Sequence, residues 1–91
     1  MQIDFKEIEE IKNIIDIRSL LDYNQKNIPG SINVPKPLLM GNPEKHLNKQ
    51  DTYFLLCDKG KVSLICAKIL NALGYKCYSI IGGIERLERN F

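Results

Sequence analysis

The feature that most constrains the fold is an alternation of short apolar runs with segments of helical pattern. The runs NIIDIR (13–18), TYFLLC (52–57) and KCYSII (76–81) lie between polar or glycine-containing segments, which is typical of buried strands. Between the last two runs, residues 63–73 indicate a helix that ends before Gly74. Its apolar side chains recur at helical spacing at Leu64, Ile65, Ile69, Leu70 and Leu73. Strands that alternate with helices predict βαβ units and a mainly parallel sheet.

Shorter elements complete the alternation. SLLDYNQK (19–26) predicts a helix with Ser19 as its N-cap and an apolar side made by Leu20, Leu21 and Tyr23. Prolines and a glycine break residues 36–51 into short helical pieces or loop. The other expected elements are strands at 2–5 and 31–34, a weak helical turn at 7–12 and a terminal helix at 84–91.

Composition narrows the class of protein. A length of 91 residues favours one domain over residues 1–91, and 44% hydrophobic with 26% charged residues is ordinary for a soluble globular protein. The net charge of +2, with lysines spread along the chain, gives no footprint for nucleic acid. No apolar run approaches the roughly 20 residues of a membrane span, and the acidic start is unlike a secretory signal.

The three cysteines are predicted to be reduced. Cys57, Cys66 and Cys77 form no Cys-x-x-Cys pair and leave an odd count, which argues against a disulfide framework or a zinc site. Reduced thiols fit a cytoplasmic protein, and we expect no metal or other cofactor. Cys66 lies in step with the apolar side of its helix and Cys77 in a strand, so we expect both to pack in the core. His46, the one histidine, is expected at the surface and is not assigned as a general base.

Cys57 is the candidate nucleophile. In an open parallel sheet, sites lie at the carboxyl ends of the strands, and Cys57 stands at such an end. The loop after it, with Gly60 inside, can turn successive backbone N–H groups inward, and the following helix adds its positive end. Both effects favour a thiolate, with help from Lys59 and Lys61 and opposition from Asp58. The alternative is an inert small residue at a strand end.

Two stretches resemble the rhodanese-like domain. IIDIRSLLDYNQKNIPGSINVP (14–35) resembles its opening, with an Asp-x-Arg pair, a short helix and an Ile-Pro-Gly segment. YFLLCDKGKVSLICAKILNALGYKCYSIIGGIERL (53–87) resembles its second half, with strand, cysteine loop, helix, Leu-Gly-Tyr, strand and Gly-Gly-Ile in order. The resemblance implies an open, mainly parallel sheet of four or five strands with helices on both faces.

The resemblance also implies a chemistry. Cys57 would accept a sulfane sulfur, become a persulfide and pass the outer sulfur to a thiol or another nucleophile. The substrates would be a small sulfur donor and a thiol acceptor, with separate partner proteins. The loop would hold the persulfide with its N–H groups. The residues assigned to substrate binding are Asp58, Lys59, Gly60, Lys61, Val62 and Ser63.

The sequence departs from the family pattern inside this loop. Members that use thiosulfate usually carry arginine just after the cysteine and again near the loop's end, where this chain has Asp58 and Val62. Lysine lacks the bidentate fork of arginine, so we expect weak thiosulfate turnover. Asn27 replaces a frequent histidine, and Arg86 and Leu87 stand where an aromatic residue is often found; these changes concern the surface or the terminal helix.

Two alternatives to the sulfurtransferase are weighed. A cysteine phosphatase or arsenate reductase needs arginine six residues after the cysteine, where this chain has Ser63, so that class is disfavoured. A non-catalytic interaction module stays open, since Asp58 and Val62 favour it and Cys57 opposes it.

For Asp16 and Arg18 we favour a structural ion pair that ties the strand end to the terminal helix through Glu85 over a role in positioning the donor. Gly82 and Gly83 are expected to form a turn with unusual φ, and a close approach to the cysteine loop is secondary.

Overall fold

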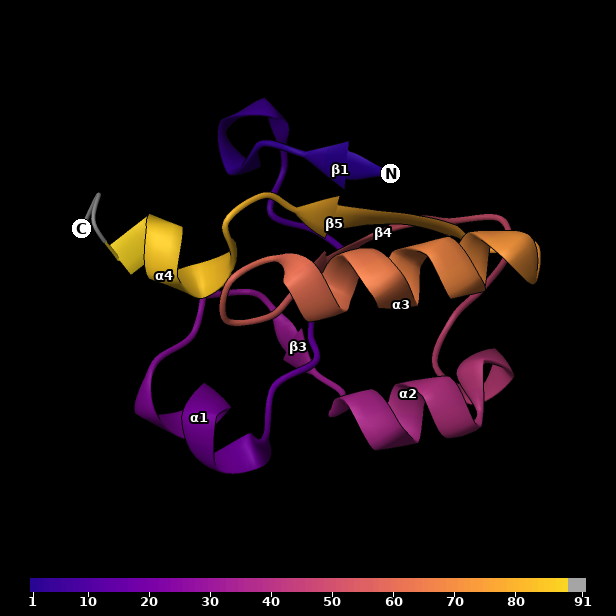
Figure 1. Ribbon diagram of the computed structural model, residues 1–91, viewed down its shortest axis with the longest axis horizontal. Coiled ribbons are helices and arrows are strands. Elements are labelled where there is room, and N and C mark those ends of the chain that lie inside the picture. The colour runs from indigo at the N-terminus through magenta and orange to yellow at the C-terminus, as the bar shows by residue number, and fades with distance from the viewer. Residues whose placement is uncertain (89–91) are drawn as a thin grey trace.

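The computed structural model describes residues 1–88 and contains one five-stranded sheet in which every neighbouring pair of strands is parallel (Figure 1). Its strands run in the order β1-β5-β4-β2-β3, so β4 lies at the centre between β5 and β2. Their bounds are β1 Gln2–Ile3, β2 Ile14–Asp16, β3 Ile32–Asn33, β4 Thr52–Leu56 and β5 Lys76–Ile80. The predicted α/β class and parallel sheet are therefore confirmed.

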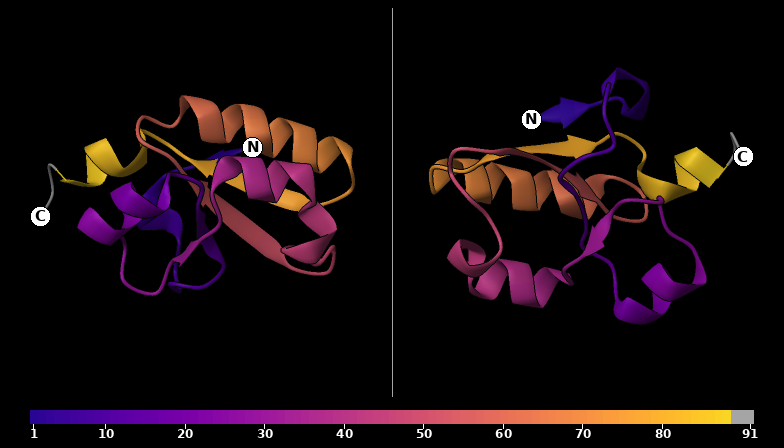
Figure 2. Two further views of the ribbon diagram at one scale, coloured as in Figure 1. Left: turned by 90° about the horizontal axis from the view of Figure 1, so that it is seen from below. Right: turned by 180° about the vertical axis from the view of Figure 1, so that it is seen from behind.

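Helices cover both faces of the sheet (Figure 2). Their bounds are α1 Leu20–Gln25, α2 Lys36–Gly41, α3 Lys61–Ala72 and α4 Gly83–Glu88, with short 3-10 helices at Phe5–Glu7 and Pro43–Lys45. One apolar core joins α2 and α3 to the sheet through Leu39, Cys66 and Leu70. The other joins α4 to the opposite face through Ile84 and Leu87. Within residues 1–88, no helix is long and apolar enough to cross a membrane.

The alternation of side chains along β4 fixes the direction in which Cys57 points. Leu55 and Cys57 belong to the core beneath α3, whereas Leu56 belongs to the core on the other face. Ser79 of β5 lies opposite Leu55 in the sheet register and is fully buried. The Cys57 sulfur and the Ser79 hydroxyl therefore both lie below the start of α3.

Several expected elements differ in detail. Ser19 caps α1 as predicted, because its Oγ accepts a hydrogen bond from the backbone N–H of Asp22 at 3.2 Å. The prediction of an apolar, core-facing side for α1 is wrong. Leu20 and Leu21 are exposed, and this helix of six residues buries no side chain. The turn expected at 7–12 forms at Phe5–Glu7 instead, and residues 89–91 of the expected terminal helix lie outside the described residues.

The predicted start and core-facing side of α3 are also wrong in part. It begins at Lys61, before the expected start, and buries Ser63, Cys66, Ala67 and Leu70. Three residues expected on its core side, Ile65, Ile69 and Leu73, are 59%, 47% and 53% exposed. A periodicity of large apolar residues cannot reveal this arrangement, because mainly small side chains face the sheet.

A buried ion pair closes the carboxyl end of β2. The Arg18 Nη2 lies 2.7 Å from Oδ2 of Asp16, and the Arg18 Nε donates to Oδ1 at 3.0 Å. The same guanidinium donates to the carbonyl of Lys26 at 2.6 Å, so the pair is fastened to the segment after α1. The prediction that it ties the strand to the terminal helix through Glu85 was therefore wrong. Asn33 adds hydrogen bonds from its Nδ2 to the carbonyls of both charged residues.

The burial of this pair predicts an unequal cost for two matched substitutions. Asp16→Asn removes the charge that compensates a buried guanidinium and should lower the free energy of unfolding by about 3–5 kcal/mol. Asp4→Asn removes the partly exposed ion pair with Arg86 but keeps an acceptor for the cap of the first 3-10 helix, and should cost less than about 1 kcal/mol. Urea denaturation of both variants measures the difference. Equal costs would show that the Asp16–Arg18 pair is not what stabilises this end of the sheet.

Candidate functional site

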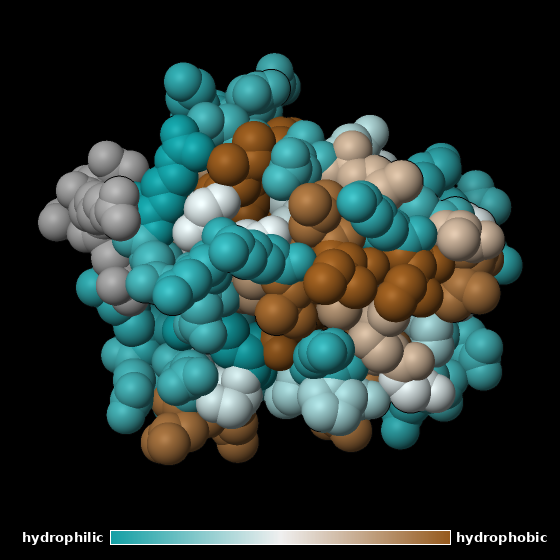
Figure 3. Space-filling view, in the orientation of Figure 1, coloured by the Kyte–Doolittle hydropathy of each residue, from teal (hydrophilic) through white to brown (hydrophobic). Residues whose placement is uncertain are grey.

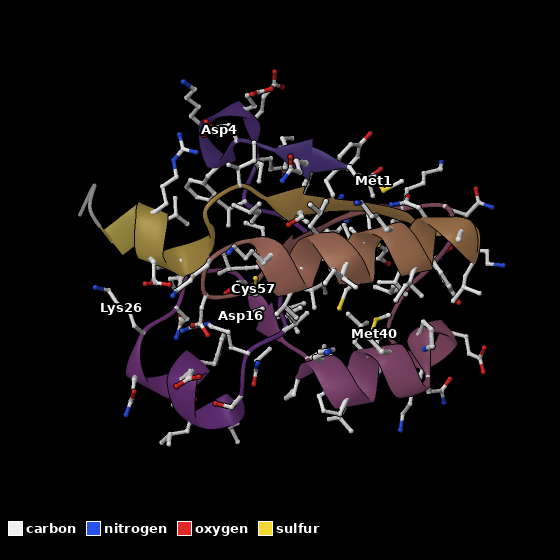
Figure 4. All side chains as sticks on the ribbon, viewed as in Figure 1. Met1, Asp4, Asp16, Lys26, Met40 and Cys57 are labelled. Atoms are coloured by element: carbon white, nitrogen blue, oxygen red, sulfur yellow. The ribbon has the colours of Figure 1, made fainter. Side chains whose placement is uncertain are left out.

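The Cys57 side chain lies at the start of α3 (Figure 4), and its sulfur is surrounded there by hydrogen-bond donors, which we call the nest. The backbone N–H groups of Gly60 and Ser63 donate to its Sγ at 3.1 and 3.3 Å. The thiol itself donates to the Ser63 Oγ at 3.1 Å. When the sulfur carries charge during a reaction, that hydroxyl can turn and become a third donor. Backbone N–H groups aimed at one atom stabilise negative charge that develops there, so this nest suits a sulfur that reacts as a nucleophile or a leaving group.

Glycine is required at the point where the loop enters α3. Gly60 is the N-cap of the helix and has a φ of +88°, in the left-handed region. A Cβ at this position would lie 2.8 Å from the backbone nitrogen of Gly82 and 3.2 Å from the carbonyl oxygen of Ile80. The backbone of the loop packs directly on the end of β5, and this contact makes the loop curve inward toward the sulfur.

The other side of the loop is held by α4. The N–H groups of Ile84 and Glu85 donate to the carbonyls of Cys57 at 2.9 Å and Asp58 at 3.1 Å. Gly83, with a φ of +61°, allows this contact, because a Cβ there would overlap both carbonyl oxygens. The expected unusual φ at Gly82 and Gly83 is confirmed, and the close approach is a main feature rather than a secondary one. With these carbonyls bound to α4, the loop presents N–H groups to the sulfur.

A pair of buried serine hydroxyls connects the sulfur to the centre of the sheet. The Ser63 Oγ lies 2.6 Å from the Ser79 Oγ, and the Ser79 hydroxyl donates to the carbonyl of Gly60 at 3.2 Å. Both serines are fully buried. Sequence reasoning missed Ser79, although a serine next to the apolar residues at the end of a predicted strand is a usable signal, since a buried hydroxyl needs a partner.

A pocket of about 340 Å³ opens beside the sulfur. Its walls mix aliphatic surface, from Ile17 and Val62, with four cationic side chains, and Asp58 is its one acidic residue among residues 1–88. The full lining comprises Ile17, Arg18, Lys36, Cys57, Asp58, Lys59, Lys61 and Val62. Such a pocket suits a small molecule with an apolar body and a negative end.

The predicted site residues fall into three positions. Cys57, Asp58, Lys59, Lys61 and Val62 line the pocket, while Gly60 and Ser63 are buried below the sulfur. Arg18 also reaches the pocket wall, whereas Asp16 is fully buried behind it; hydrogen bonding to Asp16 raises the pKa of Arg18. Lys36 was missed because it lies in the proline-broken region, where the N–H of Lys36 donates to the carbonyl of Ile17 and places α2 beside the pocket.

The other two cysteines differ from Cys57. Cys66 and Cys77 are each 1% exposed and belong to the core beneath α3, as expected. Burial raises the pKa of the Cys77 thiol to about 11 and also raises the pKa of Cys66. Both therefore remain protonated near neutral pH. His46 lies outside the lining of the pocket around Cys57, next to a separate surface hollow.

Comparison with known proteins identifies the family. The family model of the rhodanese-like domain matches residues 2–90, so the chain belongs to the rhodanese-like domain family. The crystal structure of reduced Bacillus anthracis CoADR-RHD superimposes with a TM-score of 0.82 at 27% identity, over 92% of this chain and 16% of that one.

Two curated relatives are named for sulfur chemistry. The "Putative sulfur carrier protein YrkF" of Bacillus subtilis (strain 168) is 31% identical over 71 residues, which is 75% of this chain. The "tRNA sulfurtransferase" of Desulfurococcus amylolyticus is 33% identical over 73 residues, which is 80% of this chain. The matched part spans 36% and 14% of the length of these two relatives.

The unequal environments of the three cysteines predict selective alkylation. Iodoacetamide at about pH 8 should modify Cys57 in the folded protein, because its sulfur borders the pocket and is open to a small reagent. Cys66 and Cys77 should react only after unfolding in urea, since burial raises their pKa values and blocks access. Peptide mass spectrometry of native and unfolded samples gives the three yields. Modification of Cys66 or Cys77 as fast as Cys57 would contradict the assigned geometry.

Proposed function

We propose that the protein is a sulfurtransferase or persulfide carrier in which Cys57 is the sulfur-accepting nucleophile. The observation that carries this proposal is the convergence of the Gly60 and Ser63 N–H groups and the Ser63 hydroxyl on one sulfur at a pocket wall. Membership of the rhodanese-like domain family and the names of the two curated relatives support the same chemistry.

The transfer proceeds by two thiolate displacements. The Cys57 thiolate attacks the outer sulfur of a donor persulfide, R–S–SH; the donor's S–S bond breaks, and R–S⁻ leaves with the bonding electrons. The product is Cys57–S–SH. An acceptor thiolate then attacks the outer sulfur, and Cys57 leaves as a thiolate. Each step breaks one S–S bond and forms another, so the two steps require no separate oxidant or reductant. Hydrogen bonds to the sulfur stabilise Cys57 both as attacking group and as leaving group.

The pocket favours a persulfide over thiosulfate as donor. Thiosulfate carries two negative charges and releases sulfite, so it needs strong cationic contacts in the transition state. Arg18 is already engaged by Asp16 and Lys26, and Lys36, Lys59 and Lys61 offer point charges without a bidentate fork. Asp58 at the pocket wall repels the dianion. A donor with one charge and an aliphatic body depends less on bidentate cationic contacts and meets less repulsion from Asp58.

The acceptor is a thiol, either small or carried by a partner protein. In the curated relatives the matched region is only part of a longer chain. A domain of this kind therefore works beside other protein segments in those relatives, which supports a protein partner here. Thiolate chemistry of this type requires reduced cysteines, and a cytoplasmic location fits that requirement.

Sulfur loading measured by intact mass tests the proposal. The protein is incubated with a low-molecular-weight persulfide and, separately, with thiosulfate. Wild-type protein should gain one sulfur atom, faster from the persulfide, and the adduct should disappear when a thiol is added. Cys57→Ser should gain none, although Cys66 and Cys77 are still present. No adduct from either donor would overturn the enzymatic proposal and leave an interaction module, whereas an adduct on Cys57→Ser would overturn the site.

A third protein in the same assay separates electrostatics from chemistry. Asp58→Arg removes the repelling carboxylate and adds a guanidinium at an exposed position of the pocket wall. Its loading rate from thiosulfate at low salt should rise about fivefold or more, with a smaller change for the persulfide donor. A flat or lower thiosulfate rate would contradict the role given to Asp58.

A further inference from the structure

The exposed side of α3 carries an apolar stripe that leads to the pocket. The stripe consists of Val62, Ile65, Ile69 and Leu73, which are 43%, 59%, 47% and 53% exposed. These residues recur three or four positions apart, so they lie along one side of the helix. Figure 3 shows the corresponding hydrophobic band crossing the face of the molecule over α3. A surface helix normally presents polar residues on the side away from the core, so this band marks a contact surface.

The stripe is continuous with the functional site. Val62 is its first member and also lines the pocket beside Cys57. A helix of 12 residues is about 18 Å long, so the stripe extends from the pocket along about half of the molecule's longest extent of 34 Å. Any macromolecule that covers the stripe from Leu73 to Val62 brings its own surface to the pocket mouth.

The charges around the stripe select its occupant. Lys36, Lys59 and Lys61 line the pocket at one end, and Lys68 is exposed on α3 itself. The helix Lys61–Ala72 contains no acidic residue, and Asp58 is the one carboxylate in the pocket lining among residues 1–88. A second copy of the chain would bring the same lysines to the contact and be repelled. A partner with an acidic surface would be attracted and steered toward the pocket.

We propose that the α3 stripe and the lysines at its pocket end form the docking surface for an acidic protein that presents a cysteine to Cys57. The proposal rests on the sulfur-transfer function proposed above. The partner's apolar side chains cover the stripe, its carboxylates face the lysines, and its thiolate attacks the outer sulfur of Cys57–S–SH, so that Cys57 leaves as a thiolate. Four side chains make a patch well below the roughly 800 Å² per partner of a stable complex, so the contact is short-lived and compatible with turnover.

Two synthetic peptides serve as probes of this surface. Each has about 20 residues, enough to form a helix, with a leucine stripe and one cysteine near its end. One peptide has glutamates beside the leucines, and the other has lysines at the same positions. Binding is measured by fluorescence anisotropy with Cys57→Ser, which cannot carry sulfur. Transfer is measured by mass with persulfide-loaded wild-type protein, using free cysteine as the small acceptor.

The acidic peptide should bind and accept sulfur about tenfold better than the basic peptide at low salt, and salt should reduce the difference. The double variant Ile65→Ser/Ile69→Ser should lose most of its binding of the acidic peptide and most of its sulfur transfer to it, while its transfer to free cysteine stays unchanged. Leu20→Ser/Leu21→Ser is the matched control, because it removes two exposed leucines from α1, away from the stripe, and should have no effect. Sedimentation velocity of the wild-type protein should show a monomer.

The outcomes distinguish this proposal from the proposed function. Equal behaviour of the two peptides, or a full effect retained by Ile65→Ser/Ile69→Ser, would overturn the docking surface even if sulfur transfer to free cysteine is normal. A dimer that dissociates in the same double variant would overturn it in favour of a second copy of the chain. Binding of the acidic peptide without sulfur loading would overturn the transfer role of the surface together with the proposed function.

Discussion

The close contact between the cysteine loop and the turn before α4 is the constraint on which the site depends. Two carbonyls of the loop, at Cys57 and Asp58, accept hydrogen bonds from the first N–H groups of α4. Glycines at positions 60 and 83 make the approach possible, because a Cβ at either would overlap the facing backbone. With its carbonyls bound on that side, the loop offers N–H groups to the sulfur. The anion-stabilising nest is thus a consequence of backbone packing rather than of cationic side chains.

This arrangement separates the stabilisation of the sulfur from the recognition of the donor. Below the sulfur, the nest continues through two buried hydroxyls, Ser63 and Ser79, into the central strands. Around the pocket mouth lie exposed lysines and one aspartate, to which the proposed function assigns the selection of the donor. The Asp16–Arg18 pair belongs to the frame, since its guanidinium is bound on two sides even where it reaches the pocket wall. Substitutions at the pocket mouth can therefore change the preferred sulfur donor while the hydrogen bonds to the Cys57 sulfur stay in place.

Much of this structure could be predicted from local sequence patterns. The central strands, the Ser19 cap, the site edge and the loop around Gly60 follow from residue types that act within a few positions. The burial of small residues on α3 could not be predicted, because the pattern of large apolar residues is equally compatible with an exposed stripe. The contact of Gly83 with the cysteine loop was expected only as a secondary feature, and those of Lys36 and Ser79 with the site stayed hidden, since they join segments far apart in the chain. Glu85 was assigned to Arg18 for the same reason, whereas the structure gives that arginine the carbonyl of Lys26.

The central claim is that fixed hydrogen-bond donors converge on the Cys57 sulfur and stabilise the charge that it carries during transfer, and the rate of sulfur loading in Ser63→Ala tests it most directly. Removing the Ser63 hydroxyl should slow loading from the persulfide donor about tenfold, as expected for the loss of one hydrogen bond to a charged group. Ser31→Ala is the matched control, because its buried hydroxyl donates to the carbonyl of Ile28 and should leave the loading rate unchanged. A loading rate of Ser63→Ala equal to that of the wild-type protein would contradict the account.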